Sequence, residues 1–232
     1  MTSTSSQWMA EGHEYFLSCL KNISDRELDG PSRLPGWSGR HLLSHVGHNA
    51  RALARLAHWA ATGEQTPMYA TTSARAEEID VGARWPAGQL RDFVVTEQDL
   101  LTGALSRISG GRWQFPVVTA QGRTVPASTI PWLRSREVWI HARDLPSGGD
   151  FTDFPEAFLD ALIDDALERR RATRSLDLDV QATDRPARPG GGGEQQLLGT
   201  AADLARWLTR GERSPALRIR SGIPVPQLSP WL

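Results

Sequence analysis

Three side chains in this sequence have the types and the spacing of metal ligands: His45, Glu137 and His141. Imidazole nitrogens and carboxylate oxygens are ligands that zinc accepts. Glu137 and His141 are four residues apart, which places them about 40° apart on one face of a helix. A metal held by only three protein groups keeps an open coordination position, as catalytic sites do. That position could activate a water, a thiol or a carbonyl group.

The same residues have other interpretations. A single inward histidine such as His45 is commonly a core imidazole with one hydrogen bond. Glu137 and His141 could form a surface pair that stabilises its helix by roughly 0.2–0.5 kcal/mol. An alternative set of ligands is His41, His45 and His48, which are spaced four and three residues apart. The residue types alone leave these interpretations open.

Helical periodicity favours the set with Glu137 over the three histidines of one helix. Ser38 is suited to a helix N-cap and Gly63 to a C-cap, and apolar residues recur at helical spacing between them. On this helix His45 lies inside the apolar face, whereas His41 and His48 lie at its edge. We therefore expect His45 to be the inward histidine.

A second helix is expected from residue 128 to about residue 145, and ionisable residues interrupt its apolar face. Burial of an ionised carboxylate such as Glu137 costs several kcal/mol unless charge or hydrogen bonds replace its water. A divalent cation shared with His141 is one such replacement. Asp144 projects from the same arc and could orient a ligand histidine, or it could pair with a neighbouring arginine.

The remaining sequence predicts more helices and a small mixed part. Helices are expected near residues 7–22, 86–108, 155–172 and 200–210, a hairpin or ordered loop at VVTAQGRTV, and a strand at SLDLDV. DRELDGPSR is expected to be a loop, and residues 64–85 are expected to be a long connection. PARPGGGGEQQ is expected to form a flexible turn, and the proline-rich tail is expected to be irregular. We therefore expect an α+β protein with a helical domain over residues 1–172 and a small α/β domain over residues 173–232.

Composition excludes several classes of protein. Among the 232 residues, 26 Lys and Arg balance 27 Asp and Glu, which leaves no excess charge to hold nucleic acid or an anionic membrane. No signal peptide or membrane span is evident, so we expect a cytoplasmic protein, either a monomer or a small homo-oligomer. The single cysteine, Cys19, excludes an intramolecular disulfide and a multi-thiolate metal site.

Several segments together resemble one known family. They are LPGWSGRHLLSHVGHNARAL, HWAATGEQTPMY, ARAEEI, TAQGRTVPAS, RSREVWIHARDL and VPQLSPWL. The sequence is similar to mycothiol-dependent maleylpyruvate isomerases, which join a DinB-like four-helix metal domain to a small C-terminal domain. The resemblance covers nearly the whole chain.

The resemblance implies both a set of ligands and a reaction. Its metal ligands match His45 in W-S-x-x-H-x-x-x-H-x-x-x-N-A, together with Glu137 and His141 in E-V-W-I-H. It implies the cis to trans isomerisation of maleylpyruvate to fumarylpyruvate, with mycothiol as the thiol and with a divalent metal, for which the ligand types favour zinc. It also implies an arginine near the end of the last helix that holds substrate or thiol. The segment WLTRGER contains two candidates for it, Arg210 and Arg213.

Three arginines are therefore candidates to bind anionic groups. Arg210 is the expected catalytic arginine, and Arg213 and Arg123 are expected to help bind the thiol cofactor or the ends of a dicarboxylate substrate. Reversible thiolate addition would turn the double bond into a single bond that can rotate. Two other functions remain open: mycothiol S-transfer to another electrophile, and a non-catalytic ligand-binding module.

Overall fold

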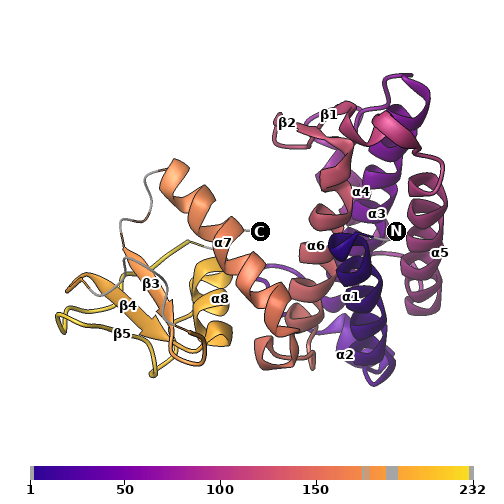
Figure 1. Ribbon diagram of the computed structural model, residues 1–232. Helices are drawn as coiled ribbons and strands as arrows, with labels where there is room; N and C mark the ends of the chain where they lie inside the picture. The colour runs from indigo at the N-terminus through magenta and orange to yellow at the C-terminus, as the bar shows by residue number, and fades with distance from the viewer. Residues whose placement is uncertain (1–2, 174–175, 177, 187–192, 230–232) are drawn as a thin grey trace. The chain divides into compact units, whose positions relative to one another are not determined.

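A computed structural model describes residues 3–173, 176, 178–186 and 193–229 (Figure 1). Its α-helices are α1 (Thr4–Lys21), α2 (Asp25–Asp29), α3 (Gly39–Thr62), α4 (Ala74–Gly82), α5 (Ala87–Leu105), α6 (Ile130–Asp144), α7 (Glu156–Ala172) and α8 (Ala201–Arg210). Its strands are β1 (Pro116–Val118), β2 (Thr124–Pro126), β3 (Asp179–Ala182), β4 (Gln196–Gly199) and β5 (Arg218–Ile219). The chain divides into unit 1, Met1–Gly149, and unit 2, Asp150–Leu232.

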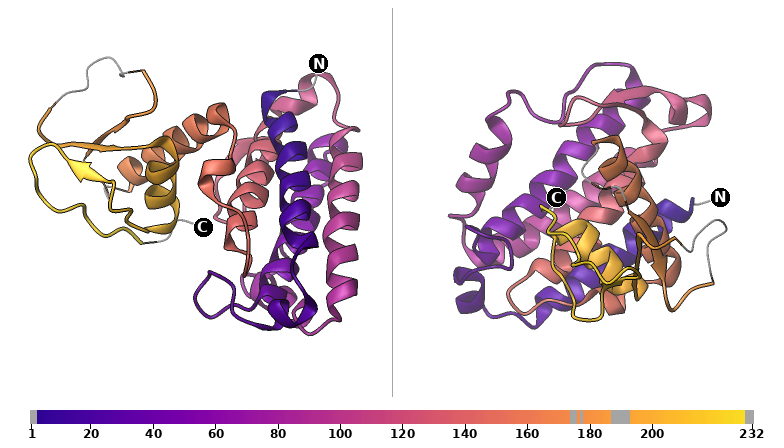
Figure 2. Two further views of the ribbon diagram at one scale, coloured as in Figure 1. Left: turned by 90° about the horizontal axis from the view of Figure 1, so that it is seen from below. Right: turned by 90° about the vertical axis from the view of Figure 1, so that its left-hand side faces the viewer.

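Unit 1 is built on four long helices. Helix α3 packs against α5 and α6, and α1 packs against α6. Figures 1 and 2 show these helices lying side by side from different directions. The predicted helical N-terminal part and small C-terminal α/β part are confirmed, and with them the α+β class. None of the described helices is both long and apolar enough to span a bilayer.

Helix α3 begins and ends where its sequence predicts. The Ser38 hydroxyl accepts a hydrogen bond from the His41 backbone N–H, and the His41 side chain accepts one from the Ser38 backbone N–H. These reciprocal bonds satisfy donors that a helix start leaves without partners. At the other end Gly63 takes a left-handed φ of 85°, which a glycine adopts without a side-chain clash. The caps fix which residues of α3 face inward.

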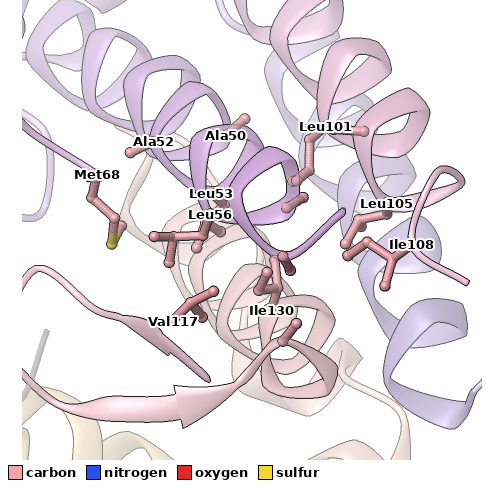
Figure 3. Close-up of a cluster of buried hydrophobic side chains, with 14 of the residues drawn as sticks. Ala50, Ala52, Leu53, Leu56, Met68, Leu101, Leu105, Ile108, Val117 and Ile130 are labelled. Atoms are coloured by element: carbon pink, nitrogen blue, oxygen red, sulfur yellow. The ribbon is translucent and has the colours of Figure 1, made fainter. Parts of the chain in front are cut away.

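The C-terminal half of α3 lies in an apolar core. Leu53 and Leu56 are buried there with Leu101 of α5 and Ile130 of α6, as the close-up in Figure 3 shows. Burying one such side chain stabilises the fold by roughly 1.5–3 kcal/mol. Strand β1 adds Val117 to the same cluster. This core holds α3, α5 and α6 together at one end of the bundle.

Two short helices occur where the sequence predicts irregular structure, so those two expectations are wrong. Helix α2 forms in the expected loop because Ser24 and Glu27 make a capping box at its start. Helix α4 forms within the expected long connection and packs against α3. The predicted hairpin is confirmed, because β1 and β2 pair antiparallel and Gly122 has a φ of 75° in the turn.

Unit 2 combines two helices with a small mixed sheet. Strand β3 pairs parallel with β4, and β4 pairs antiparallel with β5. The amphipathic helix α8 begins at its predicted N-cap, Thr200. The units divide earlier than the expected boundary at residues 172/173, because α7 packs against α8. Part of the expected PARPGGGGEQQ turn lies outside the described residues.

Candidate metal centre

Helices α3 and α6 bring three possible metal ligands together in unit 1. Nε2 of His45 lies 3.0 Å from Oε2 of Glu137 and 3.1 Å from Nε2 of His141. The same Oε2 of Glu137 lies 3.2 Å from Nε2 of His141. These three residues, which we call the HEH cluster, form the one group of potential metal ligands found among the described residues.

The HEH cluster is shielded from water. His45 is 3% exposed and His141 2% exposed, and Glu137 is partly buried with a side chain that is 13% exposed. The Trp37 ring lies edge-on to the His45 imidazole, with ring centroids 5.3 Å apart. Three converging donor atoms of the types that zinc prefers, held in a buried place, fit a divalent cation. Because Glu137 keeps some exposure, the cluster is reachable from one side.

Asp144 fixes the orientation of one cluster histidine. Its Oδ2 lies 2.9 Å from Nδ1 of His141, and the residue is fully buried. A hydrogen on Nδ1 leaves the Nε2 lone pair of His141 directed at the cluster. Oδ1 of Asp144 also lies 3.5 Å from Nη1 of Arg143, so both pairings that the sequence suggested occur together. Asp144 therefore links the site to the end of α6.

Burial and mutual contacts set the charges of the cluster. Burial alone would raise the pKa of Glu137, but hydrogen bonds and charges from His141 and His45 hold it well below the usual value. Burial lowers the pKa of His45 to about 4, against the opposing effect of Glu137. Burial would also lower the pKa of His141, but Asp144 and Glu137 raise it overall. The cluster thus holds an ionised carboxylate beside a neutral His45.

A buried arginine of α6 connects the helices around the cluster. Arg134 of α6 is fully buried and donates to Oε1 of Gln98, to the Val46 carbonyl and to Oδ1 of Asn49. Burial lowers its pKa to about 10, so the guanidinium stays charged at neutral pH. These bonds join α6 to α3 and α5 and do not involve the HEH cluster directly.

The alternative set of three histidines on α3 does not come together. His41 hydrogen-bonds the Ser38 hydroxyl through Nδ1 at 2.7 Å, as part of the cap. His48 is buried, although the sequence places it at the edge of the apolar face, and its ring lies 4.8 Å from that of Phe93. His48 is covered because Gly82 has no side chain, which lets α4 come close to the side chains of Ser44 and His48.

The three predicted anion-binding arginines are placed in different parts of the molecule. Arg123 is exposed in the turn between β1 and β2, and within the described structure its side chain makes no contact with the HEH cluster. Arg210 is buried at the end of α8, and Arg213 is exposed and donates to the Val225 carbonyl. Both belong to unit 2, so their part in the site stays a prediction.

Two residues beside the cluster escaped the sequence analysis. Nη2 of Arg75 lies 3.5 Å from Nδ1 of His45. Burial raises the pKa of the neighbouring Tyr69 to about 12, and the positive charge of Arg75 opposes that rise. Both come from the segment expected to be an unstructured connection. The available signal was the family resemblance, because Tyr69 ends HWAATGEQTPMY and Arg75 lies in ARAEEI, two of the segments that carry it.

Comparisons with known proteins identify the family of this chain. A family model described as the mycothiol maleylpyruvate isomerase N-terminal domain matches residues 9–146. A crystal structure of the mycothiol-dependent maleylpyruvate isomerase has 35% sequence identity and a TM-score of 0.86, covering 98% of this chain and 95% of that chain.

A crystal structure of a histidine-to-alanine mutant of the mycothiol-dependent maleylpyruvate isomerase has 34% identity, the same TM-score of 0.86, and coverage of 98% and 95%. The comparison with curated proteins finds no match. The family model spans more than half of the chain and includes every residue of the HEH cluster. The chain therefore belongs to the mycothiol maleylpyruvate isomerase family.

Proposed function

We propose that this protein catalyses the mycothiol-dependent isomerisation of maleylpyruvate to fumarylpyruvate. The observation that carries the proposal is the HEH cluster of His45, Glu137 and His141, found in a chain of this family. We further propose that zinc is the bound metal, because the cluster offers two imidazoles and one carboxylate. The cytoplasm, where mycothiol would be available, is the proposed compartment.

The reaction requires rotation about a carbon–carbon double bond. A thiolate that adds to the double bond next to the ketone converts it to a single bond, which rotates before the sulfur is expelled. The sequence contains one cysteine, Cys19, which lies on α1 and is not part of the HEH cluster. The nucleophilic sulfur is therefore supplied by a separate thiol, for which mycothiol is the proposed source.

The residues of the site have distinct tasks in this proposal. His45, Glu137 and His141 would hold the cation, which when bound supplies Lewis-acid chemistry that lowers the pKa of an entering thiol. Asp144 accepts a hydrogen bond from Nδ1–H of His141 and thereby keeps the ring oriented. Trp37 covers one side of the His45 ring and limits the access of water. Arg210, Arg213 and Arg123 remain proposed contacts for the anionic ends of substrate or thiol.

Metal analysis combined with a turnover assay tests the proposal. The full chain is purified without chelators, its bound metal is measured, and fumarylpyruvate formation is followed with and without mycothiol. We expect about one zinc per chain and turnover that depends on both metal and mycothiol. Metal-loaded protein that conjugates mycothiol to other electrophiles but leaves maleylpyruvate unchanged would indicate an S-transferase instead. Protein that purifies without metal would indicate a binding module.

A further inference from the structure

Arg75 lies beside the HEH cluster and has no carboxylate partner among the described residues. It is the second residue of α4, its side chain is exposed, and Nη2 lies 3.5 Å from Nδ1 of His45. Within the part of the chain that the structure describes, no ion pair joins its guanidinium to an acidic residue. Glu78, one turn further along α4, lies 3.8 Å from Arg55 instead. The positive charge of Arg75 is therefore available to a ligand.

His45 and His141 differ in the group that lies next to the Nδ1 atom of the ring. For His141 the partner is the Asp144 carboxylate, which accepts a hydrogen bond at 2.9 Å. For His45 the only group within hydrogen-bond distance of Nδ1 among the described residues is the Arg75 guanidinium. When Nε2 of His45 binds a metal, Nδ1 carries the hydrogen and is a donor. A guanidinium also has only donors, so Nδ1–H and Arg75 lack an acceptor between them.

Tyr69 completes the surroundings of the guanidinium. Burial raises the pKa of Tyr69 to about 12, and the positive charge of the nearby Arg75 opposes that rise. The phenol is therefore neutral at physiological pH and adds a polar group without adding negative charge. Its position is half-buried, whereas Arg75 remains open to solvent. A positive, donor-rich place thus lies next to His45, at a guanidinium that is open to solvent.

We propose that Arg75 and Tyr69 form a carboxylate-binding subsite beside His45. The guanidinium binds one carboxylate of the substrate in a two-point arrangement, and Nδ1–H of His45 donates to the same group after a small shift of the Arg75 side chain. The subsite gives His45 the acceptor that Asp144 gives His141. Its identity as part of a dicarboxylate site rests on the proposed function.

This arrangement has a chemical consequence for the substrate. A carboxylate held beside His45 places the adjoining carbon chain next to the open side of the HEH cluster. The positive charge of Arg75 also stabilises the negative charge that develops when a thiolate adds to the double bond. Arg75 therefore affects both the binding of the dicarboxylate and the rate of its conversion, with the larger effect on binding.

The experiment measures carboxylate binding separately from turnover. Maleate is the probe, and its affinity for the zinc-loaded full chain is measured by calorimetry. Arg75→Gln is expected to weaken maleate binding roughly ten- to hundredfold, because it removes a charged hydrogen-bond donor pair. Arg75→Lys should recover part of that loss, and Tyr69→Phe should lower affinity only a few-fold. All three variants should keep the zinc content of the original protein.

A matched control uses the same substitution elsewhere in the same region. Arg84 is exposed just beyond the C-terminal end of α4, so Arg84→Gln removes an equal charge away from the cluster. It should leave maleate affinity unchanged. Unchanged maleate affinity in Arg75→Gln, or an equal loss in Arg84→Gln, overturns the subsite.

Turnover assays on the same proteins distinguish the subsite from the proposed function. With maleylpyruvate, Arg75→Gln should raise KM about tenfold or more and lower kcat by a smaller factor. If the unmodified protein does not isomerise maleylpyruvate but binds maleate in an Arg75-dependent manner, the subsite stands and the proposed substrate is wrong. If the protein isomerises maleylpyruvate and Arg75→Gln changes neither KM nor kcat, the proposed function stands and the subsite is wrong.

Discussion

The two halves of helix α3 use the same backbone for different purposes. The N-terminal half buries polar side chains, among them His45, His48 and Asn49, each with a partner that satisfies it. The C-terminal half buries Leu53 and Leu56 in an apolar cluster with no such polar groups. Apolar packing of the C-terminal half fixes the position of α3. The position of His45 in the N-terminal half is thereby fixed as well. Site and core should therefore respond to different substitutions.

The largest effect is expected from His45→Ala. The variant should lose bound metal and lower isomerase activity by more than roughly hundredfold, because a direct ligand contributes more than its supporting partners do. Its far-UV circular dichroism should not change, since the apolar half of α3 stays intact. His58→Ala, at an exposed position on the same helix, is the control and should keep metal and activity. Retained metal in His45→Ala would falsify the ligand assignment.

The complementary substitution is Leu53→Ala in the apolar half. Removing this buried side chain should lower the free energy of unfolding by about 2–5 kcal/mol, measured by denaturant titration. Metal content per folded molecule should stay the same. Leu100→Ala, at a position that is 57% exposed on α5, should change stability by less than about 0.5 kcal/mol. A loss of metal in folded Leu53→Ala would show that metal binding in the N-terminal half of α3 depends on packing in the C-terminal half.

A weaker effect on the site is expected from Asp144→Asn. The amide cannot provide the carboxylate charge that orients Nδ1–H of His141, so metal affinity should fall roughly 10–100-fold. Competition with a metal-binding dye measures that affinity. Asp92→Asn, an exposed position on α5, serves as the matched control. Equal affinities for the two variants would contradict the orienting role of Asp144.

The cap of α3 should contribute a smaller amount. Ser38→Ala removes the hydroxyl that accepts from the His41 N–H, and thermal unfolding should reveal a loss of about 1 kcal/mol. Ser73→Ala at the start of α4 is a suitable comparison, because Ser73 makes no side-chain cap hydrogen bond there. That variant should lose only a few tenths of a kcal/mol. A larger loss of stability in Ser73→Ala than in Ser38→Ala would contradict the capping role of Ser38.

The last prediction concerns acid stability through His48. Burial lowers the pKa of His48 from 6.5, so the unfolded chain takes up a proton at a higher pH than the folded chain does. The free energy of unfolding should therefore decrease as pH falls below about 6.5, because only the unfolded state gains that proton. The unmodified protein and His48→Gln are both treated with chelator, and their free energies of unfolding are compared by urea titration at several pH values. An unchanged pH dependence in His48→Gln would contradict this interpretation.

The sequence predicts α3 and the HEH cluster well for a local reason. Ser38 and Gly63 define the helix ends, and helical spacing then determines that His45 faces inward. Glu137 and His141 are neighbours on α6 for the same reason. That Glu137 and His141 of α6 lie next to His45 of α3 could not be predicted from local sequence. That prediction required knowledge of the fold, which the family resemblance supplied. The assignment of the three as metal ligands remains a prediction.

Other features depend on contacts that local sequence does not encode. His48 is buried because Gly82 allows α4 to approach, and a Cβ at Gly82 would lie only 2.3 Å from Oγ of Ser44. Arg75 reaches His45 through the same approach of α4 to α3. Helix α4 has no sustained apolar periodicity, so its sequence resembles a loop. The boundary between the units likewise depends on the packing of α7 with α8.

The bonds of Arg134 determine how the cluster responds to the loss of its ion. They tie α6 to Val46 and Asn49 of α3 and to Gln98 of α5 through contacts that do not include the ligands. We therefore expect α3, α5 and α6 to stay in place when no ion is bound, so that an ion enters or leaves without refolding of the helices. The ion bound in a cell would then depend on which divalent ions are supplied as well as on intrinsic affinity. Growth medium would then decide the metal composition of the purified enzyme.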